Sequence, residues 1–138
     1  MEKNICEILS SAKNICVVGI SDKPDRDSGR IALFLQSKAY QLSGVHPIVK
    51  KVDTIPVYLS ISEVPGQIDI LDIFLNGDRL PSILEQILTV KPKCVWLQLG
   101  VHNDKFVAEV EKNNIPVIQD CCIAIEYRNC SNAGNLGN

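Results

Sequence analysis

Apolar runs of strand length recur along the chain and are separated by longer segments with a helical pattern. Residues 15–20 form a continuous apolar run, which is typical of a strand that is covered on both faces. Further runs of this kind are 41–45, 68–74, 94–99 and 115–119. The pattern predicts a sheet of buried strands, with residues 15–20 as its central strand.

The segments between these runs predict helices. The first helix ends near Ala39, and its apolar side carries Ile31, Leu33, Phe34 and Leu35. A second helix has Pro81 near its start, because proline suits the first helical turn. A third helix is expected to begin at a cap formed by Asn103 or Asp104 and to run to about Lys112.

Two prolines limit the strands on one side of the sheet. Pro47 closes the strand at 41–45, because proline donates no backbone hydrogen bond and restricts the residue before it. Residues 48–54 have the pattern of a loop. Residues 55–58 contain Pro56 and predict a short edge strand, where proline is tolerated.

Strands joined by helices of this length form right-handed parallel crossovers. We therefore expect a single α/β domain at 1–130 with a Rossmann-like, doubly wound parallel sheet, and a flexible C-terminal tail at 131–138. In the dinucleotide-type strand order, the direction of winding reverses between the strands that end at Ile20 and Phe74. Ligands bind outside the carboxyl ends of the strands at such a reversal.

Composition narrows the class of protein. The formal net charge is −2 and the basic residues are scattered, so the chain has no basic face for nucleic acid. Its apolar stretches are too short for a membrane span, and the N-terminus lacks a secretion signal, which predicts a cytoplasmic location. The six cysteines are expected to be reduced thiols. The sequence has no CxxC pair and no pair of histidines at ligand spacing, so it does not indicate a metal site.

The polar loop after the first strand is the strongest candidate site. It leads into a helix whose free N–H groups attract phosphate. Lys23, Arg26 and Arg30 add three positive charges, and Ser21 and Ser28 add hydroxyl groups. The plainer alternative is a solvated loop in which neighbouring aspartates neutralise these cations. Its place after the central strand favours phosphate binding.

A nicotinamide dinucleotide is the alternative cofactor. Such domains usually carry GxGxxG at this loop and an acidic residue about 20 positions later. This loop offers only Gly19 and Gly29, and the second strand ends in Val45-His46-Pro47 without a carboxylate. These differences weigh against ordinary NAD binding.

Several motifs together resemble the small bacterial and archaeal coenzyme A-binding proteins, which are similar to the nucleotide-binding domain of the succinyl-CoA synthetase alpha chain. The resemblance covers residues 14–128. Its motifs are Val18-Gly19-Ile20-Ser21, Val45-His46-Pro47, Asp69-Ile70-Leu71-Asp72-Ile73-Phe74, Val95-Trp96-Leu97-Gln98-Leu99-Gly100-Val101 and Asp120-Cys121-Cys122-Ile123. It implies coenzyme A or an acyl-CoA as ligand. With the loop above, the expected cofactor-binding residues are Gly19, Ile20, Ser21, Lys23, Arg26, Ser28, Arg30, His46, Pro47, Phe74, Gln98 and Gly100.

The chain also departs from this family. Leu75-Asn76 stands where the family usually has an arginine after its phenylalanine, so one cation expected at the ligand is missing. A scaffold subunit with a vestigial pocket is therefore an alternative to a CoA-binding module. We favour the binding module, which would act as a carrier, a sensor or an accessory module. A protein partner or a homodimer is expected.

An enzyme is the remaining alternative. No Ser-His-Asp or Cys-His spacing indicates catalysis, and Cys122 is the one candidate for a thiol-dependent reaction, with burial as its plainer explanation. Burial is also favoured for Trp96 over stacking on a base. Gln98 can bind a ligand or a neighbouring loop, and Asp120 is expected to have a structural role.

Overall fold

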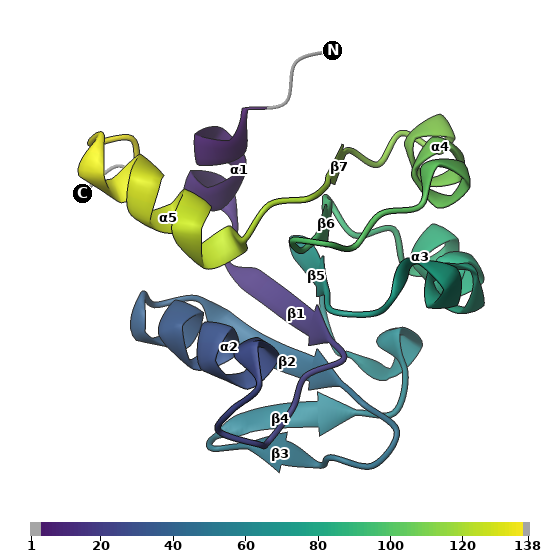
Figure 1. Ribbon diagram of the computed structural model, residues 1–138, viewed down its shortest axis with the longest axis horizontal. Coiled ribbons are helices and arrows are strands. Elements are labelled where there is room, and N and C mark those ends of the chain that lie inside the picture. Colours follow the sequence, from purple (N-terminus) through teal and green to yellow (C-terminus); the bar gives the residue numbers. More distant parts are fainter. Residues whose placement is uncertain (1–3, 137–138) are drawn as a thin grey trace.

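A seven-stranded sheet forms the centre of the computed structural model, which describes residues 4–136 (Figure 1). The strands are β1 (Asn14–Val18), β2 (Gln41–Val45), β3 (Lys51–Val52), β4 (Ile55–Tyr58), β5 (Ile70–Ile73), β6 (Val95–Leu97) and β7 (Val117–Ile118). Their spatial order is β3-β4-β2-β1-β5-β6-β7, and only the β3–β4 pair is antiparallel. The predicted doubly wound fold is confirmed, with its reversal between β1 and β5.

Helices cover both faces of the sheet (Figure 1). One face packs against α1 (Ile5–Ser11), α2 (Asp27–Ser37) and α5 (Ile123–Asn132). The other packs against α3 (Leu84–Val90) and α4 (Asp104–Lys112). Two 3₁₀ helices, η1 (Ile61–Glu63) and η2 (Gly77–Ile83), lie on the α3 side, and η2 leads directly into α3. The helix expected near Pro81 therefore begins as a 3₁₀ helix.

From Ile15 to Val18, the central strand β1 is apolar because it contributes to both cores. Ile15 and Val17 pack in the cluster with α1, α2 and α5, whereas Cys16 and Val18 pack in the cluster with α3 and α4. Successive side chains of a strand point to opposite faces, so both sets are buried. Burial raises the pKa of the Cys16 thiol to about 12, and this cysteine is an apolar core residue, as expected.

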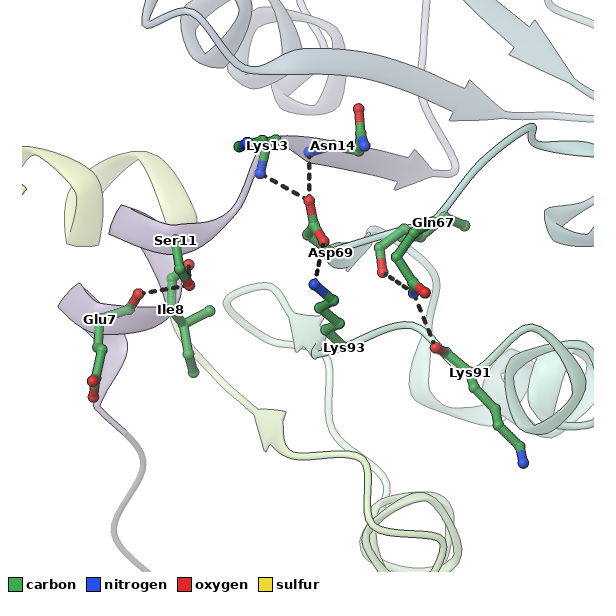
Figure 2. Close-up of polar contacts among 10 residues, drawn as sticks. Glu7, Ile8, Ser11, Lys13, Asn14, Gln67, Asp69, Lys91 and Lys93 are labelled. Atoms are coloured by element: carbon green, nitrogen blue, oxygen red, sulfur yellow. Dashed lines mark hydrogen bonds and ion pairs between the residues drawn. The ribbon is translucent and has the colours of Figure 1, made fainter.

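Asp69 fastens the amino ends of the central strands (Figure 2). Its Oδ2 accepts hydrogen bonds from the backbone N–H groups of Lys13 and Asn14, each at 2.9 Å, and Lys93 Nζ lies 3.5 Å from its Oδ1. Partial burial opposes ionisation, but the two backbone donors and Lys93 outweigh it and hold the pKa of Asp69 below its usual range. Asp69 is thus a structural residue. It lies at the amino ends of the strands, whereas ligands are expected at their carboxyl ends.

The edge of the sheet next to β2 differs from the prediction. Residues 55–58 do form a strand, but β4 pairs with both β2 and β3 and is not the edge. The edge strand is β3, in a segment that we expected to be a loop. Pro56 lies opposite Lys51 in the antiparallel pair, so the short β3 covers a strand whose proline limits its pairing.

The prediction that all cysteines are reduced is wrong for two of them. Cys6 in α1 and Cys130 in α5 form a disulfide, with their Cα atoms 5.5 Å apart. Both helices lie in segments for which no element was predicted, and Figure 1 shows them side by side. The pairing depends on this packing, which brings together residues 124 positions apart in the chain.

The C-terminal segment continues beyond the expected domain end. Helix α5 ends at Asn132, and Leu136 packs against the α1, α2 and α5 cluster. The flexibility of residues 131–138 stays a prediction, and residues 137–138 lie outside the described part of the chain. Within residues 4–136, no helix combines the length and the apolar character that a membrane span requires.

Candidate functional site

A cleft of about 1040 Å³ opens at the carboxyl ends of β1, β2 and β5. It is lined by most of the loop 19–28, by His46 and residues 48–50, and by Phe74 and Arg79. We call it the main cleft. It lies where the strand order reverses, which is the position that open α/β sheets use for ligands.

Two glycines let the loop between β1 and α2 pack closely. Gly19 has a φ of +82°, and a Cβ there would lie 2.9 Å from the carbonyl oxygen of Phe74. At Gly29, a Cβ would overlap the carbonyl oxygen of Ser21. The loop therefore folds back on the first turn of α2, which brings the backbone of that turn to the floor of the main cleft.

The N-terminus of α2 offers hydrogen-bond donors to the cleft. Its N-cap residue, Arg26, makes no side-chain capping bond, whereas Asn4 caps α1 and Asn103 caps α4. The first N–H groups of a helix have no partner within it and carry the positive end of the helix dipole. Asp27, at the start of α2, lines the cleft beside the buried Ser28. An anion in the main cleft would meet these donors.

The charged side chains of the cleft come from three segments. The described cations that line it are Lys23, Arg26, Lys50 and Arg79, and the described carboxylates are Asp22, Asp25 and Asp27. The carboxylates all come from residues 22–27, which are the β1–α2 loop and the first residue of α2. The main cleft therefore has one more positive than negative side chain, which suits a phosphorylated ligand.

His46 shapes the wall of the cleft beyond β2. Its Nδ1 accepts hydrogen bonds from the backbone N–H groups of Ile48 and Val49, both at 3.0 Å. An asparagine side-chain oxygen can make the same kind of turn, and here the His46 ring nitrogen takes that part. These bonds assign the remaining ring proton to Nε2.

Two smaller pockets adjoin the main cleft. The α3-side pocket, of about 320 Å³, lies between residues 45–47, residues 59–61 and the start of α3, and its wall includes Phe74 and Arg79. The α5-side pocket, of about 190 Å³, lies on the other face of the sheet and is lined by Asp27, Ile31, residues 74–76, Gln98, Leu99, Val101 and Cys122. Phe74 lines all three hollows. An elongated ligand could extend from the main cleft in either direction.

Comparison with known families decides the kind of site. The model of the CoA binding domain family matches residues 13–128. The chain belongs to this family of CoA-binding domains.

Relatives of this CoA-binding domain include a curated protein and solved structures. The chain is 32% identical over 123 residues to the uncharacterized protein YneT of Bacillus subtilis (strain 168), covering 89% of this chain and 91% of that protein. It is 28% identical to cell-free ID.343 from Thermus thermophilus, with a TM-score of 0.88 and coverage of 92% of this chain and 98% of that chain.

A larger enzyme shares the fold. The dinucleotide forming acetyl-coenzyme A synthetase 1 of Ca. Korarchaeum cryptofilum, solved in complex with phosphate and ADP, is 18% identical, with a TM-score of 0.71. The match covers 80% of this chain but only 26% of that chain. One part of the synthetase therefore shares the fold of this CoA-binding domain. The likeness assigns no activity to this chain.

Most of the residues expected at the cofactor lie around the cleft. Eight line the main cleft: Gly19, Ile20, Ser21, Lys23, Arg26, Ser28, His46 and Phe74. Pro47 lines the α3-side pocket and Gln98 the α5-side pocket. The other two line none of the three hollows. Arg30 forms an ion pair with Asp27 and a hydrogen bond to the carbonyl oxygen of Pro24, and Gly100 donates its N–H to Asp120.

Two of the cations were not among the residues expected from the sequence. Lys50 lies in the segment expected to be a loop, and Arg79 lies on η2. Both residues can be recognised as charged in the sequence. Their place at the cleft depends on the direction of the chain after Pro47, for Lys50, and on the 3₁₀ geometry of η2, for Arg79. Leu75 lacks the charge of the family's usual arginine, and Arg79 brings a cation to the same wall from four residues further on.

Two expectations of structural roles agree with the contacts. Trp96 is fully buried, and its Nε1 donates a hydrogen bond to the carbonyl oxygen of Cys121 at 2.9 Å, so it is a core residue. Asp120 Oδ1 accepts the Gly100 N–H at 3.0 Å and joins the loops after β6 and β7. Cys122 is half-buried and lines the α5-side pocket. Within residues 4–136, no cluster of three or more His, Cys, Asp or Glu side chains is arranged to hold a metal ion.

Proposed function

We propose that this CoA-binding domain binds coenzyme A or an acyl-CoA, with the ligand's diphosphate at the N-terminus of α2. The observation that carries the proposal is the main cleft itself. Uncapped helix N–H groups, Lys23 and Arg26 converge on it from one segment. Arg26 is exposed and, among the described residues, forms no ion pair, which leaves its guanidinium available to a phosphate.

Apolar side chains around the mouth suit the rest of such a ligand. Ile48, Leu59 and Leu99 are 79%, 69% and 60% exposed, and each lines one of the three hollows. Exposed apolar groups that gather at a cleft commonly mark a binding site. We propose that the base occupies the α3-side pocket and that the pantetheine arm passes Phe74 toward the α5-side pocket.

The role that we propose is that of a carrier, sensor or accessory module without catalytic machinery of its own. The described residues that line the main cleft bear cationic, carboxylate, hydroxyl, imidazole and apolar groups. His46 is the side chain there best suited to proton transfer, and its Nδ1 is committed to the backbone of the next turn. A cytoplasmic location and a protein partner or homodimer remain predictions.

A thiol-dependent reaction is a second candidate, because Cys122 lines the pocket proposed for the pantetheine end. A Cys122 thiolate could attack the carbonyl carbon of an acyl-CoA thioester, form a new thioester on its Sγ and release the CoA thiol. The neighbouring Cys121 is less suited to this reaction. Partial burial and the charges of Glu126 and Asp120 raise the pKa of its thiol and so disfavour the thiolate.

Isothermal titration with CoA, acetyl-CoA, NAD and ATP tests the first proposal. We expect saturable heat with the two CoA forms and weaker binding of NAD and ATP. Absence of heat with both CoA forms at millimolar ligand would reject it, and tighter binding of NAD would favour the dinucleotide alternative.

Mass spectrometry after incubation with acetyl-CoA tests the second proposal, with Cys122→Ser as the variant and Cys121→Ser as the control. It fails if the wild-type protein acquires no acyl group.

A further inference from the structure

Arg79 lies where the main cleft and the α3-side pocket meet. Four residues line both hollows: Gly19, His46, Phe74 and Arg79. Arg79 is the only lysine or arginine among them. The other described side chains of the α3-side pocket are apolar, hydroxyl, amide or imidazole groups. Any anionic group of a ligand at this junction would therefore meet the Arg79 guanidinium.

The backbone that carries Arg79 is held in place by its neighbours. The Arg79 N–H donates to the carbonyl oxygen of Asn76 at 2.9 Å, and the Ser82 hydroxyl donates to the Arg79 carbonyl oxygen at 2.6 Å. Leu80 is fully buried, and Gly77 packs so closely on His102 that a Cβ would overlap the His102 carbonyl oxygen. Arg79 therefore projects from a fixed turn, which reduces the entropic cost of placing its charge on a ligand.

The guanidinium of Arg79 is available to a ligand. Its side chain is exposed, and among the described residues the ion pairs join Arg30 to Asp27 and Lys93 to Asp69. The three carboxylates of the main cleft lie in the β1–α2 loop and at the first residue of α2, whereas Arg79 belongs to η2. Without Arg79, the described cations and carboxylates that line the cleft would balance. Its charge thus supplies the excess of one positive side chain among those that line the cleft.

We propose that Arg79 binds a phosphate group carried on the ribose of the bound nucleotide, and so selects CoA over ligands that lack this group. The inference rests on the proposed function. A diphosphate at the N-terminus of α2 and a base in the α3-side pocket leave the ribose between them, at the junction where Arg79 lies. The planar guanidinium can donate two parallel hydrogen bonds to such a phosphate.

Titration of CoA and dephospho-CoA, which differ only in the ribose phosphate, tests this role. Arg79→Gln should weaken CoA binding by at least about tenfold, because a hydrogen-bonded charge pair is lost. It should change dephospho-CoA affinity by less than about threefold, since that ligand has no group for Arg79 to bind. Arg79→Lys should restore part of the preference for CoA. Arg128→Gln removes a guanidinium that lies over Phe34, away from the cleft, and is the matched control.

Each other outcome overturns the proposal. Equal losses for CoA and dephospho-CoA would show that Arg79 acts on the diphosphate or on the pocket as a whole, and unchanged affinities would show that it binds neither ligand. A thermal unfolding curve like that of the wild type excludes misfolding of the Arg79→Gln variant. If the wild-type protein binds no form of CoA, the proposed function itself fails, and this inference with it.

Discussion

The Gln98 side-chain amide donates to both carboxylate oxygens of Asp72, with Nε2 2.8 Å from Oδ1 and 3.1 Å from Oδ2. Asp72 is fully buried in β5, in the centre of the sheet. Burial raises the pKa of its carboxyl to about 8, although the bond from Gln98 opposes this effect. The hydrogen bonds to Asp72 therefore hold the Gln98 side chain at the wall of the α5-side pocket. The Asp72 carboxyl is largely protonated at neutral pH.

This raised pKa predicts how stability depends on pH. The folded state binds one proton more than the unfolded state between about pH 4 and pH 8. The stability due to Asp72 is therefore complete below the unfolded pKa, falls progressively as the pH rises above it, and is fully lost once the pH has risen through 8. Asp72→Asn should reduce the slope of unfolding free energy against pH in this range by up to about 1.4 kcal/mol per pH unit. Urea unfolding at several pH values measures the slope.

Asp69 provides the matched control, because its pKa is shifted in the opposite direction. Asp69→Asn should destabilise the protein at neutral pH, and the difference from the wild type should shrink as the pH falls through the lowered pKa of Asp69. A wild-type slope that survives in Asp72→Asn would show that another group carries the pH dependence.

The two arginines near α2 should differ in their effect on the ligand. Arg26 lines the main cleft, whereas Arg30 is paired with Asp27 and lines none of the three hollows. Arg26→Gln should weaken CoA binding about tenfold, and Arg30→Gln by less than about threefold, because only the first removes a charge-assisted bond to phosphate. Titration of both variants gives the comparison. A larger loss for Arg30→Gln would mean that its pair with Asp27 opens when the ligand binds.

Reduction of the disulfide should cost stability. In the chain-entropy model, a link between residues 124 positions apart restricts the unfolded chain strongly, and such links contribute about 2–5 kcal/mol. Cys6→Ser/Cys130→Ser should unfold at lower urea concentration than the wild type and should not respond to dithiothreitol. Thiol titration of the unfolded wild-type protein without reductant should find the four cysteines outside the disulfide, Cys16, Cys94, Cys121 and Cys122. Reaction of all six cysteines would contradict the pairing.

Gly29→Ala separates helix propensity from packing. Alanine favours a helix over glycine by about 1 kcal/mol, so propensity alone predicts a more stable protein. The overlap of the new Cβ with the Ser21 carbonyl oxygen predicts the reverse, a loss of about 1–3 kcal/mol. It should also weaken CoA binding, because the loop must move away from α2. Denaturant unfolding decides the sign, and a stabilised variant would show that the loop yields easily.

The strand order was predictable because it follows from long-range rules. The run at 15–20 has apolar side chains for both faces of a strand, which places this strand in the centre of the sheet. Right-handed crossovers then fix the neighbours of this strand, β1. Strand β3 was not predictable, since Lys51 and Val52 are too few to show alternation. Helix α5 does carry a signal in the sequence, since Ile123, Tyr127 and Cys130 recur at helical spacing.

The candidate site was predictable only where it is local in sequence. The β1–α2 loop gathers phosphate-binding groups within a few residues, and the family motifs add His46 and Phe74. The placement of Arg30 outside the cleft depends on its rotamer and its pair with Asp27, and that of Arg79 on the 3₁₀ turn of η2. Neither is encoded in a pattern along the chain.

Cys6 and Cys130 both lie outside the residues matched by the family model, one on each side of 13–128. Their bond closes the whole CoA-binding region into a covalent ring. A single proteolytic cut in an exposed loop between them, including the loops around the main cleft, would yield two pieces that stay attached until a reductant is added.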